Sequence, residues 1–184
     1  MTAAKTANGV QYWYFMKNIY LIGMMGSGKT TTGQALAKLF ALKFVDVDDL
    51  IVERAHQSIN DIFKKQGEPY FRKLESEILH EVSMRSSQVA STGGGIVLMP
   101  ENVEQMKKTG TVIYLKTSLE VLWERVKDKT DRPLLKTRKP QKTLADLLRD
   151  RSFLYEAAQN KTFLTDQKTP EEVATEIYKT CFSK

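Results

Sequence analysis

The sequence is poor in the residues that build disulfide frameworks and transition-metal sites. Its 184 residues include one cysteine, Cys181, and two histidines, His56 and His80. A single cysteine cannot form a disulfide within the chain or supply a cysteine-based metal site, and two histidines are too few for a histidine-rich one. This composition is typical of a reducing compartment, so we expect a cytoplasmic protein.

The chain also lacks a long apolar run. The aromatic cluster at residues 12–16 (Tyr-Trp-Tyr-Phe-Met) is too short for a signal peptide or a membrane span, and Lys17 and Asn18 interrupt it. We therefore expect no membrane association. Because Met16 would be a natural start ahead of the first strand, we predict that residues 1–16 are an accessory extension and residues 17–184 a single domain.

Positive charge is in excess but is concentrated in one segment. The formal net charge is +6, and seven Lys or Arg residues lie between Lys127 and Lys142, against Asp128 and Asp131. Such a cluster suits a phosphorylated small ligand as well as a nucleic acid. Because no familiar RNA- or DNA-binding motif accompanies it, we expect a small-molecule partner and no nucleic acid.

The most informative motif is a glycine-rich loop. Residues 23–30, Gly-Met-Met-Gly-Ser-Gly-Lys-Thr, match G-x-x-x-x-G-K-[ST] between an apolar strand-like stretch and a helix-like one. Backbone N–H groups and the helix N-terminus can hold phosphates there, Lys29 can reach the outer ones, and the Thr30 hydroxyl can bind Mg²⁺. We predict a nucleoside triphosphate as the ligand, held by Gly26, Ser27, Gly28, Lys29, Thr30 and Thr31.

The rest of the chain alternates between strand-like and helix-like segments. This pattern predicts an α/β fold of the P-loop NTPase type, a three-layer sandwich with a five-stranded parallel sheet and helices on both faces. We expect strands at Ile19–Gly23, Lys43–Val47, Gln88–Thr92, Thr111–Leu115 and Lys161–Leu164. We expect helices at Lys29–Phe40, Asp48–Arg54, Ile59–Lys64, Tyr70–Arg85, Pro100–Lys108, Ser118–Lys127, Leu144–Ala158 and Pro170–Thr180.

One segment, residues 130–143, breaks this alternation. It is basic, contains Pro133 and Pro140, and follows a helix without an obvious strand. It is either a solvated surface loop or a mobile lid over the phosphates. Since phosphoryl transfer requires that water be kept from the γ-phosphate, we favour a lid that carries Arg132.

Two carboxylates follow the second predicted strand. Ligands of open α/β sheets bind at the carboxyl ends of the strands, so Asp46 and Asp48 should face the phosphate site. If the strand continues between them, their side chains point the same way. We expect Asp46 to bind Mg²⁺ through water and Asp48 to contact the acceptor hydroxyl. The alternative is that Asp48 only caps the next helix.

Three further groups of residues follow. Arg72 and Glu75 lie three apart on a predicted helix and could be only a surface pair. The three glycines Gly93, Gly94 and Gly95 close a strand, where they let the backbone approach a ligand closely. Arg151 lies on the helix after the predicted lid.

Six motifs in register closely resemble the shikimate kinase family. They are Gly-Met-Met-Gly-Ser-Gly-Lys-Thr (23–30), Asp-x-Asp (46–48), Phe-Arg-x-x-Glu (71–75), Gly-Gly-Gly (93–95), Arg-Pro-Leu-Leu (132–135) and Arg-x-x-x-Tyr (151–155). Each later motif is weak alone, whereas six in order are specific. The resemblance runs from about Lys17 to the C-terminus.

The resemblance implies transfer of the ATP γ-phosphoryl group to the 3-hydroxyl of shikimate, on the route to chorismate and the aromatic amino acids. It implies a catalytic set of Lys29, Asp48 and Arg132, with Asp48 as the candidate base. It implies that shikimate is bound by Asp48, Arg72, Gly93, Gly94, Gly95 and Arg151. It also implies that Arg125 packs on adenine, that Pro170 borders that base, and that Glu75 is a partner of Arg72.

Other readings of the motifs stay open. Another small P-loop kinase, acting on gluconate or a nucleoside monophosphate, would share the phosphate loop. Asp48 and the three glycines favour a hydroxylated carboxylate as the acceptor. A non-catalytic ATP-binding protein would be expected to lack Asp48, Arg72 or Arg132, and all three are present. We expect the chain to work as a monomer.

Overall fold

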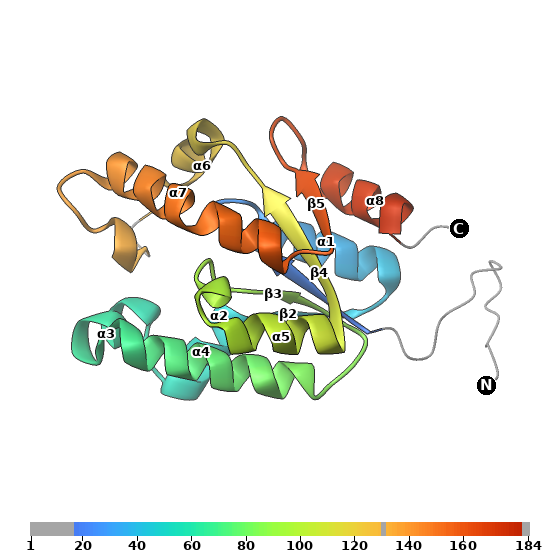
Figure 1. Cartoon of the computed structure of the whole chain (residues 1–184), viewed down its shortest axis with the longest axis horizontal. Helices are drawn as coiled ribbons and strands as arrows, with labels where there is room; N and C mark the ends of the chain where they lie inside the picture. Colours follow the sequence, from blue (N-terminus) through green and yellow to red (C-terminus); the bar gives the residue numbers. More distant parts are fainter. Residues whose placement is uncertain (1–16, 130–131, 182–184) are drawn as a thin grey trace.

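The computed structural model describes residues 17–129 and 132–181, so the accessory extension predicted at residues 1–16 lies outside the described residues. Within the described ranges, five parallel strands form one sheet in the order β2-β3-β1-β4-β5 (Figure 1). This confirms the predicted five-stranded parallel sheet. The strands are β1 (Asn18–Ile22), β2 (Lys43–Asp46), β3 (Gln88–Ser91), β4 (Gly110–Lys116) and β5 (Lys161–Leu164).

Helices connect each strand to the next, as parallel pairing requires, and one more helix follows β5. They are α1 (Lys29–Phe40), α2 (Val47–Ala55), α3 (Ile59–Lys65), α4 (Gly67–Ser83), α5 (Pro100–Thr109), α6 (Leu119–Val126), α7 (Pro140–Ala158) and α8 (Pro170–Cys181), with short 3₁₀ helices η1 (Ile96–Leu98) and η2 (Pro133–Leu135). Across residues 17–129 and 132–181, no helix is both long and apolar enough to cross a membrane.

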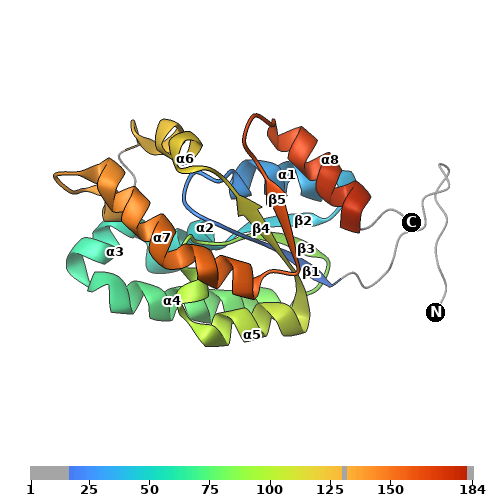
Figure 2. The ribbon, with the colours of Figure 1, turned by 45° about the horizontal axis from the view of Figure 1, so that its top comes forward.

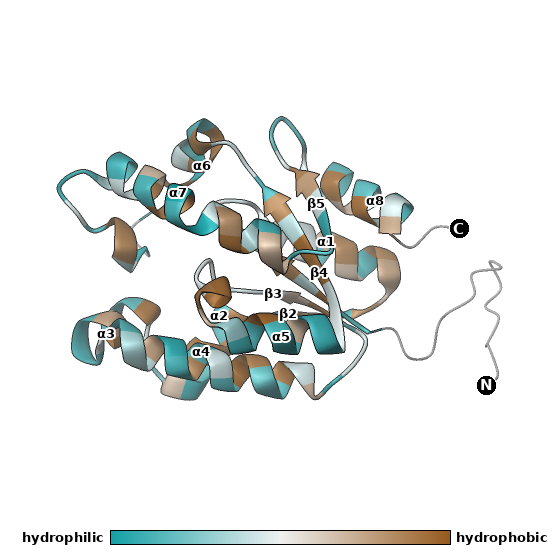
Figure 3. Ribbon diagram, viewed as in Figure 1, coloured by the Kyte–Doolittle hydropathy of each residue, from teal (hydrophilic) through white to brown (hydrophobic). Residues whose placement is uncertain are grey.

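Both faces of the sheet are covered, which makes a three-layer sandwich. Figure 2 shows α1 and α8 on one side of the sheet and α4 and α5 on the other. Ile19 and Leu21 of β1 pack toward α1 and α8, whereas Tyr20 and Ile22 pack toward the layer of α2, α4, α5 and α7. This alternation follows from the two-residue period of a strand. Figure 3 shows the apolar residues gathered on the sheet and on the inner faces of the helices.

Two helices begin three or more residues earlier than the sequence predicts, and in both cases a proline lies in the first turn. Helix α7 starts at Pro140 instead of Leu144, with the proline at the first helical position, where its missing N–H is no loss. Residues 140–143 of the segment expected as a lid are therefore helical. Helix α4 starts at Gly67, whose φ of +84° turns the chain into the helix ahead of Pro69.

Burial of α1 against α8 and the sheet should carry much of the stability. Leu36 of α1 is 0% exposed, whereas Leu39 on the same helix is 49% exposed. We expect Leu36→Ala to lower the free energy of unfolding by about 3 kcal/mol, through lost burial and the cavity left behind. Leu39→Ala, the matched control, should change it by less than about 1 kcal/mol. Urea titrations that gave equal losses would contradict this assignment of the core.

Candidate active site

The candidate site lies at the carboxyl ends of the strands, where three loops meet. The phosphate loop follows β1, the first turn of α2 follows β2, and the Gly93–Gly95 loop follows β3. The order β2-β3-β1 places these three connections side by side. Open α/β sheets bind their ligands at this edge.

The phosphate loop has the backbone that its glycines predict. Gly23 has φ +144° and Gly28, the N-cap of α1, has φ +89°. A Cβ on Gly23 would lie 2.6 Å from the carbonyl oxygen of Leu115, so a side chain there would push the loop off the sheet. The loop therefore leads directly from a central strand into the N-terminus of α1, which suits it to an anion.

Lys29 is buried within this loop. It is 8% exposed, and its Nζ donates hydrogen bonds of 2.9 Å to the carbonyl oxygens of Gly23 and Met24. Burial lowers the pKa of Lys29 to about 8, with Asp48 and Asp46 acting in the opposite direction. The ammonium group is thus held at the mouth of the loop, close to two carboxylates.

Thr30 and Asp46 form an oxygen cluster suited to Mg²⁺. The Thr30 hydroxyl donates to Asp46 Oδ2 at 2.8 Å and lies 3.4 Å from the hydroxyl of Ser91. Hydroxyl and carboxylate oxygens beside a phosphate loop are the donors that Mg²⁺ takes together with phosphate oxygens and water. Ser91 was not predicted; its only sequence signal is its place between a buried strand and three glycines.

The expected placement of Asp48 on a continuing strand is wrong, because β2 ends at Asp46 and α2 begins at Val47. Asp46 Oδ1 accepts a hydrogen bond of 3.0 Å from the Asp48 backbone N–H, so Asp46 is the cap of α2 and Asp48 lies in its first turn. The alternative that Asp48 caps the helix is therefore wrong as well. Burial and the nearby Asp46 raise the pKa of Asp48 to about 6.

A pocket beside the phosphate loop gathers every residue predicted to bind the acceptor. The pocket is lined by Met25, Asp48, Ile59, Phe63, Phe71, Arg72, Glu75, Gly93, Gly94, Gly95, Arg132, Pro133, Leu134 and Arg151. Asp48 Oδ1 and Glu75 Oε1 are buried and accept no hydrogen bond from the described residues. Because a buried polar atom without a partner is costly, these oxygens are suited to a hydroxylated ligand.

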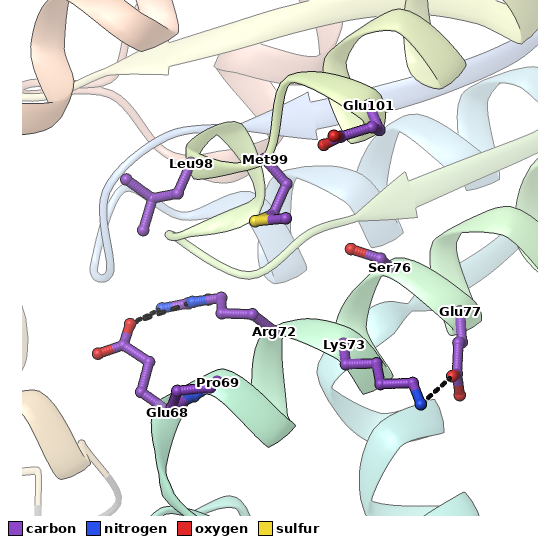
Figure 4. A pocket seen from close by; sticks show the side chains of 9 residues that line it. All are labelled: Glu68, Pro69, Arg72, Lys73, Ser76, Glu77, Leu98, Met99 and Glu101. Atoms are coloured by element: carbon purple, nitrogen blue, oxygen red, sulfur yellow. Dashed lines mark hydrogen bonds and ion pairs between the residues drawn. The ribbon is translucent and has the colours of Figure 1, made fainter.

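Arg72 and Glu75 are not a surface pair. Arg72 is 9% exposed and Glu75 is 0% exposed, and Arg72 Nη1 donates to Glu75 Oε2 at 2.8 Å. The other edge of the guanidinium donates from Nε and Nη2 to Glu68 Oε1 at 3.1 and 2.7 Å (Figure 4). Figure 4 also shows that Glu68, Leu98 and Met99 line a groove behind Arg72. The contact with Glu68 was not predicted from the sequence.

The three glycines are required by the close approach of charged side chains. A Cβ on Gly93 would lie 2.3 Å from Glu75 Oε1, and a Cβ on Gly95 would lie 2.3 Å from the guanidinium of Arg72. Arg151, 5% exposed, donates from Nη1 to the carbonyl oxygen of Gly94 at 3.2 Å. Arg72 and Arg151 therefore reach this loop from two different helices, α4 and α7.

A second pocket lies beside the phosphate loop. Its lining brings together Ser27, Gly28 and Thr31 of the loop with Arg125 and Pro170, residues that were all expected to contact ATP. Arg125 donates to the carbonyl oxygens of Gly26 and Thr165, both at 3.2 Å. These contacts orient the arginine across the pocket.

Arg132 lines the acceptor pocket, and its charge also acts on Lys29 of the phosphate loop. It precedes η2 and lines the acceptor pocket with Pro133 and Leu134, so the described part of the expected lid lies over the acceptor side. Its positive charge lowers the pKa of both Lys29 and Asp48, although burial is the largest effect on each. Arg132 is therefore close enough to Lys29 and to Asp48 for its charge to act on both.

Comparison with known proteins identifies the family. Residues 25–182 match the family model described as shikimate kinase. The chain is 44% identical over 164 residues to the shikimate kinase of Thermodesulfovibrio yellowstonii, covering 89% of this chain and 94% of that protein. The chain belongs to the shikimate kinase family. The family, its ATP-dependent phosphotransferase class and the fold are thus those that the motifs predict.

Two solved structures differ in what their similarity to this chain shows: one is of the same family, and the other shares only the fold. The shikimate kinase from Acinetobacter baumannii in complex with shikimate has a TM-score of 0.87 and 38% identity, covering 89% of this chain and 92% of that one. A gluconokinase from Sinorhizobium meliloti has a TM-score of 0.55 at 20% identity, covering 88% and 89% of the two chains, and this shows a shared fold alone.

The buried carboxyl of Glu75 should make stability depend on pH. Burial raises its pKa from 4.5 to about 7, with Arg72 acting in the opposite direction. Between these values the native state holds the proton more tightly than the unfolded chain, so this group destabilises the fold progressively as pH rises. Glutamine has no carboxyl group to ionise, so Glu75→Gln does not lose stability in this way as pH rises.

We therefore expect the free energy of unfolding of Glu75→Gln, relative to wild type, to improve by about 1 kcal/mol or more between pH 4.5 and pH 7. The measurement is urea unfolding across that range. Glu77→Gln, at a half-exposed position on the same helix, is the control and should run parallel to wild type. A parallel profile for Glu75→Gln would contradict the raised pKa.

Proposed function

We propose that this chain transfers the γ-phosphoryl group of ATP to the 3-hydroxyl of shikimate, giving shikimate 3-phosphate and ADP. The observation that supports this most is the composition of the acceptor pocket. Asp48 and two buried arginines from different helices, Arg72 and Arg151, line one pocket beside a phosphate loop. That set suits a small acceptor carrying both a carboxylate and hydroxyl groups.

The arginines would bind the acceptor carboxylate. A guanidinium donates five N–H groups in a planar fork that matches a carboxylate. Glu68 and Glu75 use three of those of Arg72, which leaves two for a ligand. Arg151 adds a second guanidinium from α7. Two forks from separate helices fix the orientation of a rigid ring, and orientation is a large part of the catalysis that phosphoryl transfer needs.

Asp48 would accept the proton of the attacking hydroxyl. With a pKa of about 6, its carboxyl group is ionised at neutral pH and can hydrogen-bond to the hydroxyl. Strong basicity is not required, because in a loose transition state the proton leaves late. Oδ1 of Asp48 accepts no hydrogen bond from the described residues, so it is the atom suited to this role.

The donor side would neutralise the phosphates. Lys29 would leave the carbonyl oxygens of Gly23 and Met24 for phosphate oxygens, and Arg132 would add charge from the acceptor side. Thr30 and Asp46 would hold Mg²⁺, Asp46 through water. When bound, the ion would offset negative charge on the phosphate groups. Arg125 and Pro170 would border the adenine in the second pocket. A monomeric state and a cytoplasmic location accompany this proposal as expectations from the sequence.

The acceptor is tested by measuring ADP release with ATP and Mg²⁺ against a panel of shikimate, gluconate, CMP and AMP. We expect shikimate to stimulate ADP release by at least about a hundredfold over the rate without acceptor, since bound acceptor supplies the positioned hydroxyl. NMR of the product would show phosphate on the 3-hydroxyl. Clear stimulation by another acceptor and none by shikimate would refute the proposal.

Single substitutions distinguish the role of the phosphate loop from that of the acceptor pocket. Lys29→Ala should lower kcat by about a thousandfold or more, because its charge stabilises the transferring group. Arg151→Ala should raise the KM for shikimate by about thirtyfold or more, the value of a lost charge-assisted contact, with a smaller change in kcat. Arg149→Ala is the control, since Arg149 is exposed on the same helix. A normal KM in Arg151→Ala would show that the carboxylate clamp is misassigned.

A further inference from the structure

Helix α7 carries a buried tyrosine with no role in the chemistry proposed above. Tyr155 lies one turn after Arg151 and is 0% exposed. Its ring stacks on Tyr114 of β4, with ring centroids 5.1 Å apart. Burial raises the pKa of Tyr155 well above that of an ordinary tyrosine, so its hydroxyl stays protonated and acts as a donor.

The Tyr155 hydroxyl donates a hydrogen bond to the carbonyl oxygen of Gly94. Arg151 Nη1 donates to the same oxygen at 3.2 Å, so the two lone pairs of this carbonyl are both used. The hydroxyl oxygen of Tyr155 also lies 3.7 Å from the sulfur of Met24 in the phosphate loop. One hydroxyl therefore contacts both loops of the site.

Gly94 is where these two loops touch. A Cβ on Gly94 would lie 3.3 Å from the backbone nitrogen of Met25 and 3.5 Å from the carbonyl oxygen of Gly23. Any shift of Gly94 therefore changes its packing on the phosphate loop. It also changes the position of the glycines that line the acceptor pocket.

We propose that Tyr155 is a positioning residue: by holding the Gly94 carbonyl while also contacting Met24, its hydroxyl fixes the distance between the Gly93–Gly95 loop and the phosphate loop. This inference rests on the proposed phosphoryl transfer. In-line transfer is sensitive to misplacement of the reacting groups by an ångström or less. A hydroxyl that touches neither substrate can therefore control kcat.

The test compares Tyr155→Phe with Tyr114→Phe in the full chain. Both variants remove one hydroxyl from a buried, mutually stacked tyrosine, and no hydrogen bond joins the Tyr114 hydroxyl to either loop among the contacts of the described residues. We expect Tyr155→Phe to lower kcat, per mole of folded protein, by about tenfold with KM values changed less than about threefold. Tyr114→Phe should keep kcat within about twofold of wild type.

A second readout does not depend on activity. Hydrogen exchange of the Ile96 and Leu98 amides, which donate to the carbonyl oxygens of Gly93 and Gly95, reports on the order of this loop. We expect about tenfold faster exchange at these amides in Tyr155→Phe and no change in Tyr114→Phe. If shikimate is not phosphorylated by wild type but this exchange rises, the proposed function fails and the positioning role stands.

Two results would overturn the inference. One is a Tyr155→Phe variant whose kcat and loop exchange both match those of wild type. The other is an equal loss of kcat in Tyr114→Phe, which would assign the effect to packing of the tyrosine pair instead of to the contact with Gly94. Thermal denaturation of both variants establishes the folded fraction used in the comparison.

Discussion

The site depends on the close approach of two backbone segments, the phosphate loop and the Gly93–Gly95 loop. No side chain fits at Gly93 or Gly95 without displacing Glu75 or Arg72, and a Cβ at Gly94 would crowd the phosphate loop itself. The absence of these Cβ atoms lets charged groups of α4 and α7 reach the edge of the sheet. The proposed donor and acceptor sites therefore share this stretch of backbone as a common wall.

The ionisable groups around this wall are only partly paired with groups of opposite charge. Four groups have pKa values shifted in the direction that favours the neutral form, and in each case burial is the largest cause. These groups are Lys29, Asp48, Glu75 and Tyr155. A buried charge is stable only when it is paired and hydrogen-bonded. The fold therefore accepts some loss of stability at this edge, which is the usual consequence of preparing a site for charged ligands.

Much of this arrangement could be predicted from the sequence, because local signals carried it. The phosphate loop, the five strands and most of the helices follow from apolar periodicity, glycines and capping residues. The position of Asp48 could not be predicted in this way: a strand and a helical turn both place it near the phosphates, and capping by Asp46 decides between them. Ser91 was missed because its contact with Thr30 forms only when β3 and α1 pack together. Glu68 was missed because the helix was predicted to begin at Tyr70, whereas α4 begins at Gly67 and so makes Glu68 and Arg72 an i,i+4 pair.

The fold alone does not select the acceptor. The gluconokinase shares the fold at 20% identity, so the fold by itself does not determine the substrate. In this chain the residues proposed to recognise and align the acceptor lie on three elements: Arg72 on α4, the glycines after β3, and Arg151 with Tyr155 on α7. Helix α7 carries both an arginine of the acceptor pocket and the tyrosine that touches the phosphate loop. If both act as proposed, one helix links recognition of the acceptor to its alignment with the donor, because Arg151 and Tyr155 donate to the same carbonyl oxygen of Gly94.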